Sequence, residues 1–326
     1  MVTSPSNSTP AARATCASRT STFAISASAS RPDLLLYYCD HHEIPLPPEH
    51  KFPMRKYRLA RERLLSTGLF AFAEAPLAPR EAIKRVHSPA YVQAFLEGTL
   101  SAAEIRRIGF PWSPALVTRT LASAGGTLAA TRQALDTGIG GTLAGGTHHA
   151  FHDYGSGFCV FNDIAIAVTD CGLRAAIVDL DVHQGDGTAA LLRTHPNVLT
   201  LSMHGRNNFP FRKQESDIDI ELDDGVTDSV YLARLDQALP RVWDFKPQIV
   251  FYQSGVDALA QDRLGRLSLT LDGLARRDEM VLGPCRSLSI PVVITLGGGY
   301  AQPIELTAEA HADTFLTARR VFGPEP

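Results

Sequence analysis

Short runs of mostly apolar residues recur along the chain and predict buried β-strands. They cover residues 34–39 (LLLYYC), 175–180 (AAIVDL), 198–203 (VLTLSM), 248–253 (QIVFYQ) and 291–296 (PVVITL). Their apolar residues stand at consecutive rather than alternate positions, so both faces of each strand should be covered. This pattern is typical of the strands of a parallel sheet.

Longer segments show the spacing of apolar residues that is typical of amphipathic helices. They cover residues 115–135, 229–242, 271–288 and 303–321. Strands that alternate with helices predict an α/β fold in three layers, with a mostly parallel central sheet and helices on both faces. No internal repeat and no long interior linker interrupts residues 32–326, so we expect one folded domain there.

The first 31 residues differ from the rest of the chain. They are rich in Ser, Thr and Ala, contain Arg13 and Arg19, and have no acidic residue before Asp33. This composition predicts a disordered N-terminal extension, which would leave the protein in the cytoplasm. The alternative is a transit peptide for a plastid or a mitochondrion, because such segments are also rich in Arg and Ser and poor in acids.

Composition excludes several other classes of protein. The net charge of −3 over 326 residues leaves no basic footprint, so we expect no direct nucleic-acid binding. No apolar run reaches the 18 residues of a membrane span, so we expect no membrane partner. The five cysteines are scattered and lack CxxC spacing, which argues against a disulfide framework and a cysteine zinc site and favours a reducing compartment.

Polar or glycine-rich segments follow four of the predicted strands directly. These segments are DVHQGDG, HGRNN, SGVD and GGGY. In parallel sheets the carboxyl ends of the strands meet at one edge, and binding sites form in the crevice beyond them. We therefore expect the four segments to meet in one site, which favours an enzyme.

The segment after residues 175–180 carries candidate metal ligands. Alternate side chains of an extended chain point the same way, so Asp179, Asp181 and His183 would share one face. Asp257, in SGVD, completes a set of three with Asp181 and His183, and catalytic zinc typically has three protein ligands. Because the set is rich in oxygen, Fe²⁺ is an alternative metal. Taken singly, each segment could also be a solvated turn or a helix cap.

Three more segments carry candidate catalytic or substrate-contacting groups. His148 and His149 stand in GGTHHA, and imidazoles titrate near neutral pH, so the pair suits proton transfer, although it could also lie in a surface loop. The glycine loop at residues 155–159 would present Phe158 as an aromatic wall. Tyr300 follows a glycine run that lacks the residues of a phosphate-binding loop, and it could donate a hydrogen bond into a cleft.

Together these motifs resemble those of the histone deacetylase superfamily, whose fold is the arginase/deacetylase fold. GGTHHA, GSGFCVFND, DLDVHQGDG, SGVD and LGGGY occur in the family's order, after RVHSPAYV at residues 85–92. The resemblance spans residues 34–321. Gln184 stands where many members have a second histidine, and this resembles the class IV and bacterial branch. So does QDRLG at residues 261–265, although Gln261 replaces the glycine of the GDRLG-like sequence.

The resemblance implies a role for each motif residue, with residues 32–326 forming the catalytic domain. The metal ligands would be Asp181, His183 and Asp257. The catalytic residues would be His148, His149, Tyr300, Asp179 and Asp186. The substrate-binding residues would be Phe158, Gly157 and Gly298. A monovalent cation, K⁺, is also implied, with contacts from Asp179 and Ser202.

Within this set, Asp179 and Asp186 would orient His148 and His149 respectively, and Tyr300 would hydrogen-bond the oxyanion. Asp179 could instead serve mainly the K⁺ ion.

The implied activity is zinc-dependent hydrolysis of an acyl-lysine-type amide by a metal-activated water. The partner would be an acyl-lysine protein or peptide, or a small acylated amine if the chain is instead an acetylpolyamine amidohydrolase. An inactive binding module is disfavoured, since no ligand is lost, and an arginase-like enzyme would need further aspartates. The segment 204–216, with Arg206, Arg212 and Lys213, would lie at the rim and meet an acidic partner or solvent. Acyl chain length and oligomeric state stay open.

Overall fold

One sheet forms the centre of the domain in the computed structural model, which describes residue 1 and residues 34–323. The strands of this part are β1 (Leu34–Tyr38), β2 (Phe70–Glu74), β3 (Ile139–Thr142), β4 (Ala175–Asp179), β5 (Val198–Gly205), β6 (Ile218–Leu222), β7 (Ile249–Gln253) and β8 (Val292–Thr295). Their order is β2-β1-β3-β8-β7-β4-β5-β6, and every neighbouring pair is parallel.

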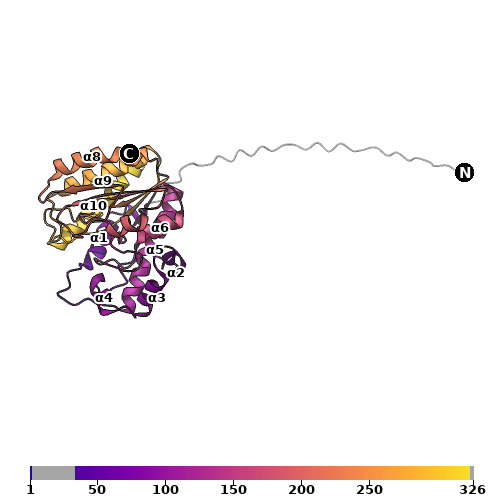
Figure 1. Cartoon of the computed structure of the whole chain (residues 1–326). Helices are drawn as coiled ribbons and strands as arrows, with labels where there is room; N and C mark the ends of the chain where they lie inside the picture. The colour runs from indigo at the N-terminus through magenta and orange to yellow at the C-terminus, as the bar shows by residue number, and fades with distance from the viewer. Residues whose placement is uncertain (2–33, 324–326) are drawn as a thin grey trace. The chain divides into compact units, whose positions relative to one another are not determined.

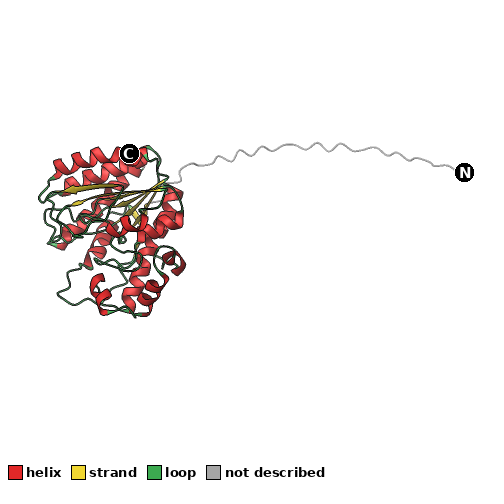
Figure 2. Cartoon of the chain, in the orientation of Figure 1, coloured by secondary structure: helices red, strands yellow, loops and turns green. Residues whose placement is uncertain are grey.

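Helices cover both faces of this sheet (Figures 1 and 2). In the described part they are α1 (Arg55–Leu65), α2 (Arg80–Lys84), α3 (Pro89–Glu97), α4 (Ala102–Ile108), α5 (Pro114–Thr137), α6 (Asp163–Cys171), α7 (Asp186–Leu192), α8 (Asp228–Asp244), α9 (Leu271–Ser287) and α10 (Ile304–Phe322). The predicted three-layer α/β fold is therefore confirmed.

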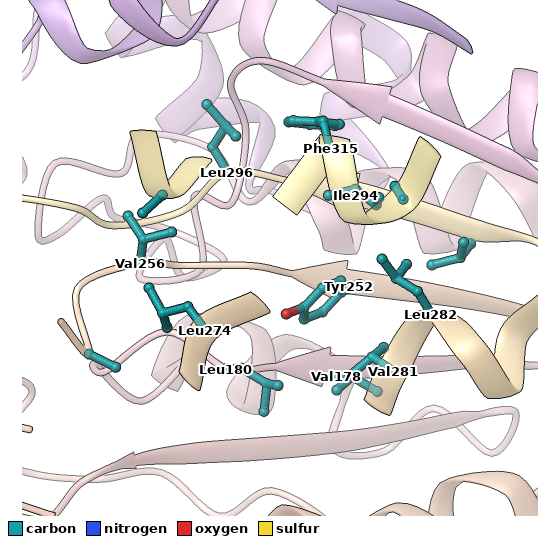
Figure 3. Packing of buried hydrophobic residues seen from close by; sticks show 14 of the residues in the cluster. Val178, Leu180, Tyr252, Val256, Leu274, Val281, Leu282, Ile294, Leu296 and Phe315 are labelled. Carbon is teal, nitrogen blue, oxygen red and sulfur yellow. The ribbon is translucent and has the colours of Figure 1, made fainter. Parts of the chain in front are cut away.

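The two faces of β4 show how the strands bury both sides. Ala175 and Ile177 pack in the core cluster that α5 and α6 complete. Ala176 and Val178 belong to the cluster on the other face, to which α1, α8, α9 and α10 contribute. Figure 3 shows the second cluster, with Tyr252 of β7 beside side chains of α9. Consecutive apolar residues thus reflect two-sided burial.

A buried charged group fixes the end of β7 against α9. Arg277 is fully buried, and its guanidinium donates to the carboxylate of Asp278 at 2.8 Å and to the carbonyl of Gly255 at 2.6 Å. A buried charge of this kind is stable only when it is paired and hydrogen-bonded. The contact with Gly255 immobilises the segment that carries Asp257.

Glycine in the middle of α5 has a packing reason. Gly125 and Gly126 lower the intrinsic helix propensity of this segment. A Cβ atom on Gly125 would stand 1.7 Å from the carbonyl oxygen of Pro76, and one on Gly126 would stand 2.7 Å from Oγ1 of Thr142. The two glycines therefore let α5 approach the loop after β2 and strand β3 closely.

The predicted strands and helices match the observed ones to within two residues at each end. Three strands were not predicted. β2 and β6 lie at the two edges of the sheet and are partly exposed, so they lack continuous apolar runs. β3 has the sequence IGGT, and its two glycines have a low strand propensity.

Two expectations concern the ends and the environment of the chain. The predicted disorder of residues 1–31 falls, apart from Met1, outside the described residues. Among the residues that the structure describes, no helix combines the length and the apolar character needed to cross a membrane.

Candidate active site

The predicted site residues meet at the carboxyl edge of the sheet. The segments that follow β3, β4, β7 and β8, the four central strands, all line or support one cavity of about 510 Å³. Its walls include both histidines of the His148-His149 pair, Asp181, His183 and Tyr300. The segments after β4, β7 and β8 were expected here from the sequence; the segment after β3 was not among the four, and the expected segment after β5 leads to Phe209, which also lines the cavity.

Asp181, His183 and Asp257 form a buried cluster, of which Asp181 and His183 line this cavity. One ligand atom from each lies within 4.8 Å of the other two. Nδ1 of His183 is 3.0 Å from Oδ1 of Asp181 and 3.0 Å from Oδ2 of Asp257. Ligands bound at about 2 Å to one zinc ion stand roughly 3–3.5 Å apart, so the cluster has the size of a metal site.

Backbone donors hold the two carboxylates of this cluster. The N–H of Gly298 donates to Oδ2 of Asp181 at 2.6 Å, and the N–H of Val182 donates to Oδ1 of Asp257 at 2.9 Å. Each carboxylate therefore keeps its other oxygen for the centre of the cluster. Such second contacts orient ligands for a metal before it binds.

The electrostatics of the cluster favour a bound cation. Burial and the charge of Asp181 raise the pKa of Asp257 to about 7. Burial opposes protonation of His183, but its contacts with Asp181 and Asp257 outweigh it and raise the pKa to about 10. Two buried carboxylates that share one imidazole thus concentrate negative charge, which a proton or a metal ion must balance.

Each imidazole of the His148-His149 pair is held by its own carboxylate. Nδ1 of His148 is 2.8 Å from Oδ2 of Asp179, and Nδ1 of His149 is 2.6 Å from Oδ1 of Asp186. All four side chains are buried. A carboxylate at Nδ1 fixes the ring and its tautomer, so that Nε2 is left for the cavity.

Burial and surrounding charges shift the pKa values of the two histidines in opposite directions. Burial lowers the pKa of His148, but Asp179 and Asp181 raise it more, and it reaches about 9. Burial and the neighbouring charge of His148 lower the pKa of His149 to about 4. The pair thus offers one imidazole that holds a proton and one that can accept a proton.

Tyr300 projects from the segment after β8 into the same cavity. Its ring lies 6.5 Å from the ring of His183 and 6.4 Å from that of Phe158, between ring centroids. Burial raises the pKa of Tyr300 well above its usual value, so the hydroxyl stays protonated and can donate. Its backbone N–H donates to Oδ2 of Asp262 at 2.6 Å.

Lys56 of α1 was not predicted from the sequence, yet it lies beside the site. It is fully buried, and its Nζ donates to the carbonyl of Gly297 at 3.0 Å and stands 5.2 Å from the centre of the Tyr300 ring. Burial lowers its pKa to about 8. The sequence around Lys56 does not predict that it lies beside the site, because its partner Gly297 is 241 residues away.

Aromatic side chains form the walls of the cavity. Phe158 lies on one side, and Phe209 packs edge-on against His149, with ring centroids 4.9 Å apart. Gly157 has a φ of 53°, and a Cβ there would stand 2.7 Å from His149. Phe209 comes from the segment that was predicted only as a rim loop.

Gly298 lies directly beside the cluster. A Cβ atom on it would stand 1.9 Å from Oδ2 of Asp257 and 2.8 Å from Oδ2 of Asp181. Any larger residue would thus displace a carboxylate. The role of Gly298 is therefore to bring its backbone N–H to Asp181, and its assignment to substrate binding stays a prediction.

Asp179 and Ser202 lie opposite each other in neighbouring strands, β4 and β5. Oγ of Ser202 is 3.0 Å from Nδ1 of His204, and both carboxylate oxygens of Asp179 have partners, in His148 and the N–H of Asp181. Their predicted contact with K⁺ stays a prediction.

Gln184 connects the cluster to the rim. Its Nε2 donates to the carbonyl of Gln214 at 2.7 Å, and its Oε1 accepts from the N–H of Gln214 at 2.8 Å. In the same segment Arg206 forms ion pairs with Glu221 and Asp223, and Nζ of Lys213 donates to three backbone carbonyls. These two cations are therefore engaged within the protein.

Comparison with known proteins agrees with the fold and the motifs. Residues 50–315 match the family model of the histone deacetylase domain, and the chain belongs to this family. It is 44% identical to an uncharacterized protein of the cyanobacterium Picosynechococcus over 88% of this chain and 99% of that one. It is 32% identical to histone deacetylase 2 of Arabidopsis thaliana, over 77% of this chain and 70% of that protein.

Two solved structures share the fold. An acetylpolyamine aminohydrolase from Burkholderia pseudomallei superposes with a TM-score of 0.71, at 21% identity, over 88% of this chain and 99% of that one. The HD domain of HDA15 superposes with a TM-score of 0.73, at 20% identity, over 90% of each chain. The resemblance inferred from the motifs is thus confirmed at the level of family and fold.

Proposed function

We propose that this protein is a hydrolase of acyl-lysine-type amides that uses a divalent metal, zinc, held by Asp181, His183 and Asp257. One observation carries the proposal: the three-ligand cluster lies beside the His148-His149 pair, and both histidines of the pair line one aromatic-walled cavity together with Asp181 and His183. Membership of the histone deacetylase family supports it.

The three ligand side chains suit the metal. Their spacing and their backbone-held carboxylates match a three-ligand catalytic site. A metal bound there would polarise the amide carbonyl and lower the pKa of a water molecule. Two carboxylates and one imidazole make the set rich in oxygen, so Fe²⁺ is the alternative metal.

The His148-His149 pair would carry the proton transfers. One imidazole takes the proton of the attacking water, and one gives a proton to the leaving amine. Asp179 and Asp186 keep both rings in place through their contacts with Nδ1. Because both rings are buried, they interact with each other and with the substrate rather than with bulk water.

Tyr300 would stabilise the oxyanion that forms as water attacks. Its hydroxyl stays protonated and faces the cavity that holds the cluster. A donor that is already in place lowers the barrier without reorganisation during the reaction. Phe158 and Phe209 would enclose the apolar part of the acyl-lysine side chain.

The remaining expectations belong to the same proposal. They are a K⁺ contact by Asp179 and Ser202, a place in the class IV and bacterial branch, and a catalytic domain over residues 32–326. The proposed compartment is the cytoplasm, or a plastid or mitochondrion if residues 1–31 are a transit peptide.

A substrate panel tests the proposal. The zinc-loaded full chain would be assayed on an acetyl-lysine peptide, peptides with longer acyl groups and acetylated polyamines, each with and without a hydroxamate chelator. The proposal expects turnover of an acyl-lysine peptide that the hydroxamate blocks. Turnover of acetylpolyamines alone would support the small-amine alternative, and no turnover of any amide by metal-loaded protein would overturn the proposal.

A further inference from the structure

Two exposed arginines stand at the mouth of the catalytic cavity. Arg106 and Arg107 end helix α4, and both line the cavity whose bottom holds Asp181 and His183. Arg107 places its guanidinium 4.7 Å from the centre of the Tyr154 ring. This contact fixes the direction of Arg107, whereas the side chain of Arg106 makes no hydrogen bond or ion pair within the described residues.

Two more exposed cations lie on the other side of Tyr300. Lys51 and Arg263 line a second hollow of about 350 Å³, which shares Leu264 and Tyr300 with the catalytic cavity. A substrate that reaches the cluster through the first cavity can therefore extend over the second. Positive charge thus flanks the entrance from segments that are far apart in the sequence.

Few carboxylates lie close to these cations. Of the residues that line the two hollows, Asp181 is the single acid, and it belongs to the metal cluster. Two acids lie nearby: Glu104, which accepts from the backbone and side chain of Ser101 and whose charge interacts with that of Arg107, and Asp262, which accepts from three backbone N–H groups. Two acids offset the charge of four cations only in part. Among the described residues none of the four cations forms an ion pair.

Arg206, by contrast, forms ion pairs with Glu221 and Asp223. Four cations around the two adjoining hollows, none of them in an ion pair among the described residues, create a positive potential there, because their fields add and the two nearby acids offset only part of them. Such a potential attracts anionic partners and repels cationic ones, most strongly at low salt.

We infer that the substrate is an acyl-lysine within an acidic protein segment, with Asp or Glu on both sides of the modified lysine. The inference rests on the proposed function and names the substrate class of the same site. The charge belongs to the flanking chain and not to the acyl group, since the acyl group would lie at the metal cluster while the cations stand at the mouth. A free polyamine, whose other amines are cationic, and a lysine-rich tail would both meet repulsion.

The test compares peptides that differ only in charge. Zinc-loaded full chain would be assayed on three acetyl-lysine peptides of equal length, flanked by Glu, Ser or Lys, and on acetylspermidine. We expect kcat/KM for the Glu peptide to exceed that for the Lys peptide by about tenfold or more at low salt, and the ratio to shrink at high ionic strength.

Variants of Arg106 and Arg263 test whether these residues cause the preference for the Glu peptide. In R106E/R263E the ratio of the two kcat/KM values should fall to one or invert, and in R106Q/R263Q it should shrink. The ratio is taken within one variant, so a general loss of activity cancels. Arg234, exposed on α8 outside both hollows, offers the matched control R234E, which should keep the wild-type ratio.

Equal kcat/KM values for the Glu and Lys peptides, a preference for the Lys peptide or acetylspermidine, or an unchanged ratio in R106E/R263E would overturn the inference while leaving the hydrolase intact. No hydrolysis of any peptide would instead mean that the proposed function itself fails.

Discussion

The carboxylate of Asp262 accepts a hydrogen bond from the backbone N–H of Tyr300, with Oδ2 and nitrogen 2.6 Å apart. Its other oxygen accepts from the N–H groups of Leu264 and Gly265, both at 2.8 Å. One side chain thereby ties the segment after β7 to the segment that carries Tyr300, the proposed oxyanion donor. Asp262 is therefore a positioning residue for Tyr300.

Substitution of Asp262 by Asn should lower kcat by about tenfold and change KM little. An amide nitrogen cannot accept, so one of the carboxylate's hydrogen bonds is lost and Tyr300 is held less firmly. Steady-state kinetics and the metal content of the purified variant would check this. D224N alters an exposed acid in a neighbouring segment and serves as the control. If D262N lost its metal as well, the residue would support the cluster rather than Tyr300.

Substitution of Tyr300 by Phe should lower kcat by about 10²–10³, the usual effect of removing one oxyanion donor. The ring stays, so the aromatic wall and the bound metal should be preserved. Rates on an acyl-lysine peptide and metal analysis of the same sample measure both. Turnover close to that of the wild type would remove the hydroxyl of Tyr300 from the mechanism.

Substitution of Gln184 by Ala should raise KM for peptides by about tenfold with a smaller effect on kcat. The side-chain amide holds Gln214 through two hydrogen bonds, and the same segment carries Phe209 into the cavity wall. Gln248, at the opposite end of the sheet, provides the control Q248A. A loss of kcat at constant KM would show instead that Gln184 acts on the neighbouring metal ligands.

Acid should destabilise the fold partly through His87. Its Nδ1 donates to the carbonyl of Phe151 at 2.8 Å, and its Nε2 accepts from the N–H of Asn162 at 2.9 Å, so the ring is neutral. Burial lowers its pKa to about 4. Between pH 6.5 and 4 the unfolded chain binds a proton at His87 that the folded chain does not. The free energy of unfolding should therefore fall by up to about 3 kcal/mol as the pH drops through this window.

Urea unfolding of the wild type and of H87Q at several pH values would measure this contribution. H87Q should be less stable at pH 7, because it loses at least one buried hydrogen bond, but should lose less stability on acidification. All other titrating groups are common to both proteins and cancel in the comparison. Parallel pH profiles would mean that His87 already binds its proton in the folded state or stays neutral in both.

Much of the fold and the cluster could be predicted because the information is local. Two-sided burial leaves continuous apolar runs, such as residues 248–253, and each run leads directly into its polar segment. Asp181, His183 and Asp257 stand next to strand ends, and the ends of parallel strands meet. The place of these three residues just after strands was therefore enough to predict that they lie together.

The parts that could not be predicted depend on contacts between distant segments. Lys56 reaches Gly297 only because α1 packs against α10, and nothing around Lys56 in the sequence reveals this. Arg106 and Arg263 come to line two adjoining hollows only after folding. Edge strands such as β6 bury one side and so show no continuous apolar run.

Metal dependence is the most direct test of the account as a whole. The chain would be stripped of metal with a chelator, titrated with Zn²⁺, and assayed on an acyl-lysine peptide at each step. We predict that activity is absent in the stripped protein, returns in proportion to bound zinc and saturates near one equivalent, while H183A binds little zinc and stays inactive. Full activity in the stripped protein, or zinc-restored activity in H183A, would contradict the assignment of the cluster as the catalytic metal site.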